Sequence, residues 1–487
     1  MDSNEFRHWG KVMVDFIADY WQSLQKRERL PIADVKPGYI RSLMPAEAPQ
    51  EAESWETIFK DLEKVVVAPN THWMHPRFFA YYPAMNSYPS IMGDMLCDAL
   101  SCVGFTWKAS PSCTELELAV LDWLAKMVQL PSYFLNANHG PAAGMIQGSA
   151  SEATLTCLLA ARTKICRNCP LRTTGTGSEL FPKLVAYCSN QAHSSVERAA
   201  LLGAVKMKKI IAKRENLYGL RGSQLAEAVE SDLRDGLIPF FFCASVGTTS
   251  SCAFDNVKEL GAVCEKYNIW MHIDAAYAGN ATICPEYRHL INGIELAESF
   301  NFNAHKWLML HFDCSVIWYK NAEFVEQAFH VDPVYLRHEY GGVVPDMRHW
   351  QIPLGRKFRS LKLWFVLRSI GIDNLQAKIR DMCQLAKEFG DMVERDSKFE
   401  LFVPVTLALA CFRLKGSNEL NEKLLLKLTK DRRIYLVPSK IDDTFFLRLA
   451  ICSQYTTSAD ISFAWDVIRE KAGELLAAEP AEYRAIL

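Results

Sequence analysis

Between about residues 78 and 370, continuous apolar runs alternate with helical patterns, and this alternation constrains the fold more than any other feature of the 487-residue chain. Strand-like runs lie at 183–189, 238–247, 269–279 and 314–319, and helical patterns include those at 114–130 and 149–164. Strands that are apolar along their whole length suit a parallel or mixed sheet with helices on both faces. We therefore predict a large α/β domain in this region.

The two ends of the chain have different patterns. Near the N-terminus, one face of a predicted helix carries Phe6, Trp9, Met13, Phe16, Ile17, Tyr20 and Leu24, and a stretch rich in proline and charge follows. Such a helix cannot form a core alone and must pack on another domain or subunit. Beyond Gly371, two helical and two β-like patterns predict a smaller α+β unit. The predicted segments are 1–85, 86–370 and 371–487.

Composition excludes several classes of partner. The 54 basic and 56 acidic residues give a net charge of −2, which argues against nucleic acid or a membrane surface as an electrostatic partner. No apolar run reaches the roughly 20 residues of a membrane helix, and no signal peptide is recognisable. The 15 cysteines form no framework, so we expect reduced thiols in a cytoplasmic protein. Cys166 and Cys169 lack a second pair at ligand spacing, so we predict no metal site.

A first motif is GMIQGSASEATL, residues 144–155. Ser149 and Glu152 fit a capping box at the start of a helix that follows a strand. A helix start with small residues offers free N–H groups and the positive end of the helix dipole, which suit a phosphate. An ordinary capped helix gives the same pattern.

Three further residues follow or end predicted strands. Asp274 in IWMHIDAAYAG ends an apolar strand, where it must pair with a cation or bind a metal. His193 in NQAHSSVERAA is either a structural hydrogen-bonding residue or a flat ring that stacks on an aromatic ligand. Lys306 in SFNFNAHKWLML either reaches solvent from a strand end or takes part in chemistry.

The combination and order of these motifs predict a phosphorylated aldehyde cofactor with a pyridine ring, pyridoxal 5'-phosphate. The helix start would bind the phosphate and His193 would stack on the ring. Asp274 would keep the pyridine nitrogen protonated, and Lys306 would bond to the aldehyde carbon. The sequence has no G-x-S-x-G elbow, P-loop, H-E-x-x-H motif or complete dinucleotide fingerprint.

Several longer motifs extend this pattern: THW, GFTWKASPSCTELE, QGSASEATL, NQAHSSVE, HIDAAYAG, NFNAHKW and RHWQIPLGRKFRSLK. With them the chain resembles, over nearly its whole length, the animal pyridoxal-phosphate-dependent aromatic amino acid decarboxylases of group II. The resemblance implies a fold-type I architecture, with a large mixed or parallel sheet domain, an N-terminal helical segment and a small C-terminal α+β domain. It also implies a homodimer with shared active sites and N-terminal helices lying across the partner.

The resemblance also implies roles for individual residues. Lys306 is the cofactor-bearing lysine, Asp274 the pyridinium partner and His193 the stacking base. Tyr335 is the mobile-loop residue that protonates the substrate carbon after carbon dioxide leaves. Further cofactor-binding residues are Ala150, Ser151, Thr249, Asn303 and His305. The substrate pocket is lined by Trp73, Tyr81, Pro83, Ala84, His193 and Gly355, with Val103 and Phe105 supplied by the partner subunit.

The chain departs from the family pattern at several positions. Ala304 replaces a proline and Asn190 replaces an aspartate. Ala142 and Ala143 stand where relatives usually carry glycine. Tyr82 and Ala84 stand where DOPA decarboxylases usually carry Phe and Thr. These departures bear on the substrate more than on the cofactor.

The resemblance implies decarboxylation of an aromatic L-amino acid, of the DOPA, tyrosine, 5-hydroxytryptophan or tryptophan type, to its amine. Alternatives are an aromatic acetaldehyde synthase, a histidine decarboxylase and a non-catalytic dimeric binding protein. The presence of Lys306, Asp274, His193 and Tyr335 argues against the last. Gly355, where histidine decarboxylases carry serine, favours an aromatic substrate, although those enzymes share Ala84. Tyr335 and His193 favour the amine, whereas Tyr82 also occurs in aldehyde-forming relatives.

Overall fold

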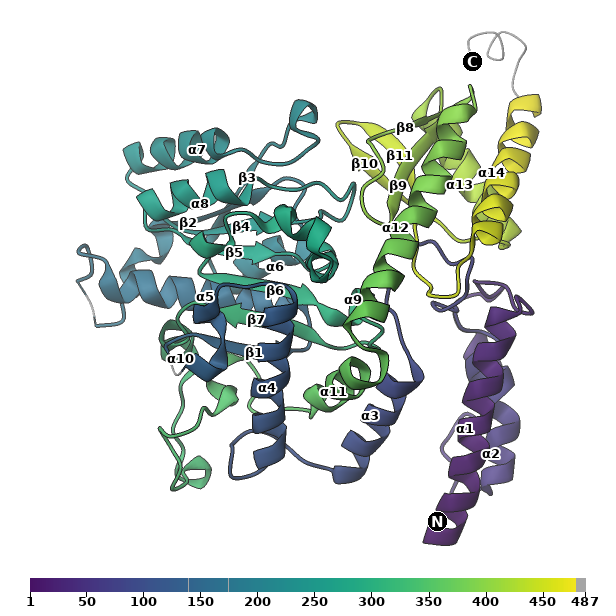
Figure 1. The fold of residues 1–487 in the computed structure, drawn as a ribbon, viewed down its shortest axis with the longest axis horizontal. Coiled ribbons are helices and arrows are strands. Elements are labelled where there is room, and N and C mark those ends of the chain that lie inside the picture. The colour runs from purple at the N-terminus through teal and green to yellow at the C-terminus, as the bar shows by residue number, and fades with distance from the viewer. Residues whose placement is uncertain (139, 174, 479–487) are drawn as a thin grey trace. The chain divides into compact units, whose positions relative to one another are not determined.

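A seven-stranded mixed sheet forms the centre of residues 84–381 in the computed structural model, which describes residues 1–138, 140–173 and 175–478 (Figure 1). The strands are β1 (Ala143–Gln147), β2 (Leu184–Ser189), β3 (Lys206–Ile210), β4 (Ile238–Ser245), β5 (Trp270–Asp274), β6 (Ser299–Asn303) and β7 (Ser315–Tyr319). Their order is β1-β7-β6-β5-β4-β2-β3. Only β7 runs against its neighbours in this sheet, so the carboxyl ends of the other strands share one edge.

The apolar runs of the sequence account for the central strands. All residues of β2, β5 and β7 are buried, as expected for strands covered on both faces. The predicted strand at 269–279 is too long, because β5 ends at Asp274 and Ala278–Ile283 forms a 3₁₀ helix. The edge strand β3 was not predicted, because its lysines give it little apolar character. Lysines on an edge strand discourage pairing with another chain.

Helices flank this sheet (Figure 1). Helix α5 (Ala150–Asn168) contacts β1, β4, β5, β6 and β7, and its buried face is built from small residues such as Ala153, Cys157 and Ala160. Small side chains let a helix approach a sheet closely. The other helices are α3 (Tyr88–Leu100), α4 (Pro111–Met127), α6 (Ser194–Leu202), α7 (Gly222–Arg234), α8 (Val257–Lys266), α9 (Ala304–Trp307), α10 (Glu323–Phe329) and α11 (Arg359–Ile370).

The second compact unit joins Met1–Pro83 to Met382–Leu487. It holds the four-stranded antiparallel sheet β10-β11-β9-β8. Its strands are β8 (Phe399–Leu401), β9 (Leu409–Leu414), β10 (Val437–Ile441) and β11 (Thr444–Ala450). Its helices are α1 (Ser3–Gln25), α2 (Trp55–Leu62), α13 (Asn418–Asp431) and α14 (Ser458–Ala478), while α12 (Ile372–Arg395) has residues in both units.

The distant parts of this second unit are joined by specific contacts. The N–H of Phe79 donates to the carbonyl of Tyr435 at 2.9 Å. The buried carboxylate of Asp460 accepts from Arg27 at 3.0 Å and from Arg77 at 3.2 Å. The first and third predicted segments therefore share one compact unit, and the three-segment division stays a prediction. The last nine residues of the third segment lie outside the described part of the chain.

The predicted N-terminal helix is present as α1. Asp2 caps it by accepting the N–H groups of Asn4 and Glu5. Trp9 stacks on Phe59 with ring centroids 5.2 Å apart, whereas Phe6 is 66% exposed. Packing of this helix on a partner subunit stays a prediction. Within the described residues, no helix combines the length and apolar character needed to cross a membrane.

Candidate active site

The predicted site residues follow the carboxyl ends of the parallel strands. His193 comes after β2, Thr249 after β4, and Asp274 is the last residue of β5. Lys306 lies in α9, directly after β6. Because these strand ends share one edge of the sheet, residues far apart in the sequence are delivered to the same region.

The sheet register fixes Asp274. Its Cα partners are Ser245 in β4 and Asn301 in β6. The N–H of Val246 donates to the Asp274 carbonyl at 2.9 Å, and the N–H of Ala276 donates to its Oδ1 at 3.0 Å. The residue is only 8% exposed. The carboxylate is therefore held in place by backbone groups at the strand end.

His193 is oriented by the first turn of α6. Its Nδ1 accepts the N–H of Ser195 at 3.2 Å and lies 2.8 Å from the Ser195 hydroxyl. Partial burial lowers the pKa of His193; the Asp274 carboxylate opposes this, and the Lys306 ammonium reinforces it. A neutral ring whose Nδ1 accepts a hydrogen bond carries its proton on Nε2. Because both charges act on this imidazole, His193, Asp274 and Lys306 form one site.

The turn that carries Lys306 is held on both sides. The N–H of Asn303 donates to the Ala276 carbonyl at 3.0 Å, and the N–H of Cys314 donates to His305 Nδ1 at 2.9 Å. Burial and the charge of Lys306 lower the pKa of His305 to about 4, so this histidine is neutral. The indole of Trp307 stacks on Tyr277 at 4.7 Å. The position of the lysine is thus set by its neighbours.

The segment that follows Ala84 is hydrogen-bonded to this turn. The N–H of Met85 donates to the His305 carbonyl at 3.1 Å, and the Ser87 hydroxyl donates to the Met309 carbonyl at 2.7 Å. The segment after Ala84 is therefore attached to the lysine-bearing turn, as a substrate-pocket residue requires.

The predicted phosphate-binding element is the start of α5. Ser149 accepts the N–H of Glu152 at 3.2 Å, as a helix cap should. The Glu152 carboxylate accepts from Gly148 at 3.1 Å, one residue before the position expected for a capping box. Ala150 is buried and Ser151 exposed, and the first amides of a helix have no intrahelical acceptor. This helix end fits an anion.

Two buried polar atoms support a ligand at this edge. Ser245 Oγ and Asn303 Oδ1 have no hydrogen-bond partner among the described residues. Buried polar atoms normally have a hydrogen-bond partner, so a bound ligand would satisfy these two. Together with an amine at Lys306, a carboxylate at Asp274 and an anion-binding helix start, they fit a phosphorylated pyridine aldehyde.

The predicted substrate-pocket residues belong to both units. In the unit that contains the N-terminus, Trp73 stacks on Tyr81 at 5.3 Å and 15°, and the Tyr81 hydroxyl lies 3.3 Å from that of Tyr435. Both Trp73 and Tyr81 are partly exposed, whereas Pro83 is buried. They form an aromatic surface in that unit.

In the sheet-containing unit, Val103 and Gly355 are neighbours. A Cβ placed on Gly355 would lie 3.5 Å from Val103 Cγ1, and Gly104 donates to the Arg356 carbonyl at 3.0 Å. The carbonyl of Phe105 accepts from Arg348 at 3.2 Å. These contacts hold the two predicted pocket segments side by side.

Tyr335 lies in a 3₁₀ turn, Val334–Leu336, between α10 and a second 3₁₀ turn, Met347–Trp350. Its side chain is 76% exposed, whereas that of Leu336 is buried. The predicted proton donor is therefore at the surface, and its catalytic role needs movement of the loop.

Sequence reasoning did not identify Ser195, Ala276 or Cys314, which orient His193, Asp274 and His305. Ser195 could have been found, because it also has a hydroxyl, which lies 2.8 Å from His193 Nδ1, and a hydroxyl is visible in the sequence. Ala276 and Cys314 act through their backbone amides, which leave no signal in the sequence.

Comparison with known proteins supports the cofactor. The model of the pyridoxal-dependent decarboxylase conserved domain matches residues 37–415. An aromatic-L-amino-acid decarboxylase from Rattus norvegicus is 53% identical over 482 residues, covering 98% of this chain and 100% of that protein. An aromatic-L-amino-acid decarboxylase from Drosophila melanogaster is 52% identical, and the match covers 98% of this chain and 92% of that protein.

Solved structures give the same result. The Oryza sativa TDC with PLP and tryptamine has a TM-score of 0.93 at 36% identity, covering 98% of this chain and 99% of that one. Catharanthus roseus tryptophan decarboxylase in complex with L-tryptophan has a TM-score of 0.91 at 38% identity. Rhodiola rosea 4-hydroxyphenylacetaldehyde synthase has a TM-score of 0.90 at 36% identity. The match to the tryptophan decarboxylase covers 98% of this chain, and the match to the synthase covers 97% of it; each covers 99% of the solved chain. The predicted fold and cofactor are confirmed, and the chain belongs to the pyridoxal-dependent decarboxylases, carboxy-lyases that use pyridoxal 5'-phosphate.

Proposed function

We propose that this protein decarboxylates an aromatic L-amino acid to the corresponding amine and carbon dioxide. The observation that carries the proposal is the grouping of His193, Asp274 and Lys306 at one sheet edge, where both charges act on the histidine. Relatives more than 50% identical over nearly the whole chain bear the name aromatic-L-amino-acid decarboxylase.

The residues that would hold pyridoxal phosphate are those of the sheet edge. Lys306 would bond to its aldehyde carbon, and Asp274 would hold a proton on its ring nitrogen. The start of α5, with Ala150 and Ser151, would bind its phosphate, with Thr249, Asn303 and His305 nearby. When bound, the cofactor supplies an electron sink for the pair released as the carboxylate leaves.

His193 would lie against the cofactor ring as a neutral imidazole. Its lowered pKa keeps it uncharged near pH 7, and its Nδ1 is occupied by the Ser195 amide. The remaining N–H at Nε2 is free of that bond and could orient the substrate carboxylate. The Asp274 carboxylate is fixed by the Ala276 amide, so it needs no rearrangement to hold a proton on the ring nitrogen of the cofactor.

Tyr335 would deliver a proton to the substrate carbon after the loop closes, which yields the amine. The aldehyde-forming alternative has two supports: the structural similarity to a 4-hydroxyphenylacetaldehyde synthase and the presence of Tyr82. The presence of both Tyr335 and His193 favours the amine. Histidine is a poorer candidate substrate, because Gly355 offers no hydroxyl to an imidazole.

We also propose a homodimer in the cytoplasm. Large apolar side chains on α3, namely Tyr88, Met92, Met95, Leu96 and Leu100, are 41–59% exposed, which suits a surface covered by a second copy. None of the fifteen cysteines forms a disulfide, which suits a reducing compartment.

The test is product analysis with purified holoenzyme. DOPA, tyrosine, 5-hydroxytryptophan, tryptophan, phenylalanine and histidine are supplied separately, and carbon dioxide, amine, ammonia and peroxide are measured. We expect carbon dioxide and amine in equal amounts from at least one aromatic substrate. Histamine exceeding every aromatic amine, or no carbon dioxide from any substrate, would overturn the proposal.

A further inference from the structure

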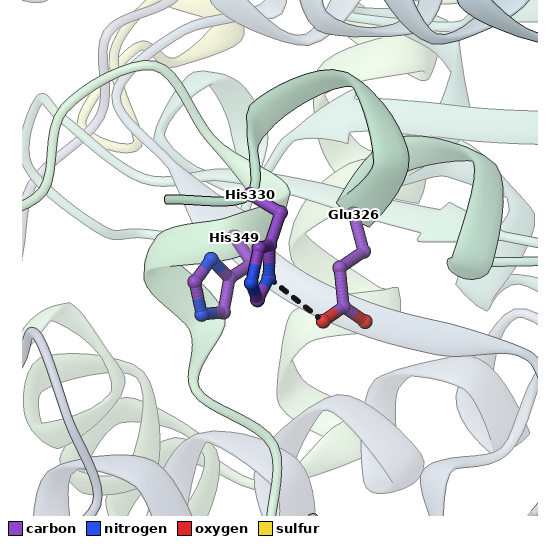
Figure 2. Close-up of side chains that lie close together, drawn as sticks. All are labelled: Glu326, His330 and His349. Carbon is purple, nitrogen blue, oxygen red and sulfur yellow. Dashed lines mark ion pairs between the residues drawn. The ribbon is translucent and has the colours of Figure 1, made fainter. Parts of the chain in front are cut away.

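Three potential metal ligands meet at the base of the loop that carries Tyr335. Glu326 and His330 lie one helical turn apart at the end of α10, and His349 lies in the turn Met347–Trp350. One donor atom from each lies within 4.8 Å of the others. Figure 2 shows the two imidazoles face to face, with the Glu326 carboxylate beside His330. The Glu326 Oε1 to His330 Nδ1 distance is 3.3 Å.

His349 distinguishes this cluster from an ordinary ion pair on a helix surface. It is only 7% exposed, and its Nδ1 has no hydrogen-bond partner within the part of the chain that the structure describes. Its ring stacks on that of His330, with centroids 4.4 Å apart and planes at 22°. A Glu–His pair explains the first two residues but leaves this buried nitrogen unsatisfied.

The neighbouring histidine in the loop is already committed. His338 Nε2 lies 3.1 Å from both carboxylate oxygens of Asp346, which also accepts from Arg348 at 2.7 Å. Among the described residues, His330 is ion-paired with Glu326 and His349 has no ion pair. The two groups therefore have different roles, and the Asp346 group holds the loop to its surroundings.

We propose that Glu326, His330 and His349 bind a divalent transition-metal ion of the Zn²⁺ class. Two imidazoles and one carboxylate are ligands that Zn²⁺ accepts, at about 2.0–2.2 Å from the metal. The side chains of Glu326 and His330 are about half exposed and can rotate toward an ion, whereas buried His349 supplies a fixed position. A cavity of about 580 Å³, lined by all three residues, leaves room for water as a further ligand.

The site would join the two ends of the catalytic loop. His330 directly precedes the segment 331–346, and His349 follows it, with Tyr335 between them. A bound ion would cross-link these ends and restrict the movement that Tyr335 needs. This consequence rests on the proposed function, whereas metal binding itself does not.

The first experiment measures binding without reference to activity. Co²⁺ is added to the pyridoxal-phosphate-loaded enzyme, and its visible ligand-field absorption is recorded, with Zn²⁺ as competitor. We expect one Co²⁺ per chain, displaced by Zn²⁺. His330→Ala, His349→Gln and Glu326→Gln should each weaken binding about tenfold or more. His289→Ala, which removes an exposed histidine elsewhere in the same unit, is the control and should bind as wild type.

Because His330 is exposed, His330→Ala should fold even if the buried His349 variant does not. Absence of Co²⁺ binding to wild type, or equal affinity in wild type and His330→Ala, would overturn the site. Any Co²⁺ that the cofactor itself binds is the same in wild type and variants, so it does not contribute to the difference in binding between them.

The second experiment tests the cross-link. Limited proteolysis within 331–346 is followed with and without Zn²⁺. Zn²⁺ should slow cleavage in wild type and leave His330→Ala unchanged. Binding with unchanged cleavage would overturn the cross-link but not the site. Failure of the enzyme to release carbon dioxide would overturn the proposed function and leave both metal readouts interpretable.

Discussion

Asp274 lies directly beside Ser245 in the sheet, and the amide that follows Ser245 donates to the Asp274 carbonyl at 2.9 Å. Parallel pairing on both sides fixes the backbone of Asp274, and the Ala276 amide fixes its carboxylate. A change of side chain at this position should therefore alter charge without moving the strand.

Asp274→Asn should lower the decarboxylation rate by about a hundredfold or more, because an amide cannot keep a pyridine nitrogen protonated. Cofactor binding is measured separately by absorbance, so that loss of rate is distinguished from loss of cofactor. Asp235→Asn, at an exposed carboxylate, is the control. Near-wild-type turnover in Asp274→Asn would exclude the proposed role.

Lys306→Ala should remain folded and lose covalent attachment of the cofactor. The turn that carries the lysine is held by the Asn303, Cys314 and Trp307 contacts, none of which uses the lysine amine. Borohydride reduction followed by peptide mass spectrometry is the measurement. A reduced cofactor adduct on another active-site lysine in the variant would contradict the assignment.

Tyr335→Phe should shift the product from amine toward aldehyde. Without the phenol, protonation of the substrate carbon slows and oxygen can take electrons instead, which yields aldehyde, ammonia and peroxide. Peroxide and ammonia are measured against carbon dioxide in air. Tyr340→Phe, in the same loop and also partly exposed, is the matched control. Peroxide equal to carbon dioxide in wild type would instead support the acetaldehyde synthase.

Gly355→Ser should fold normally and raise the ratio of kcat/KM for histidine to that for the best aromatic substrate about tenfold. The new Cβ would make an ordinary contact of 3.5 Å with Val103, and the hydroxyl could bond to an imidazole. Gly355→Ala controls for volume alone. An unchanged ratio would show that this position does not select the substrate.

Acid should destabilise the protein between about pH 6.5 and pH 4. Burial lowers the pKa values of His75, His272 and His305 to about 4, so these residues take up protons on unfolding in that range. The contribution of these neutral histidines to the free energy of unfolding is complete above pH 6.5 and decreases as the pH falls toward 4. Asp255, whose pKa burial raises to about 6, acts in the opposite direction. Urea unfolding of wild type and His272→Asn from pH 7 to 4.5 checks this, since the variant should show a shallower slope.

Much of the large domain could be predicted because its central strands are buried on both faces, and burial leaves continuous apolar runs. The direction of β7 could not be predicted, since an antiparallel strand in this position is as apolar as a parallel one. The edge strand β3 was missed because three of its five residues are lysines.

The grouping of Lys306, Asp274 and His193 was predictable because each follows or ends a strand, and parallel strand ends converge. The Glu326–His330–His349 cluster was not, because the prediction of no metal site was based on the lone cysteine pair, on the absence of an H-E-x-x-H motif and on Asp274, none of which involves these three residues. Glu326 and His330 have helical spacing, but His349 lies 19 positions further on, and no local pattern places it opposite them.

The antiparallel course of β7 has a consequence for how this chain tolerates insertions. Asn303 in β6 pairs with Ser315 in β7, so the lysine-bearing turn spans residues 304–314 between two hydrogen-bonded neighbours. Connections between parallel strands cross over through helices and can lengthen without disturbing the strand ends. The segment 304–314 has no such freedom, because both of its ends are fixed in one ladder. Length changes should therefore be tolerated in the crossover loops and not here, where one added residue would displace the amine from the sheet edge.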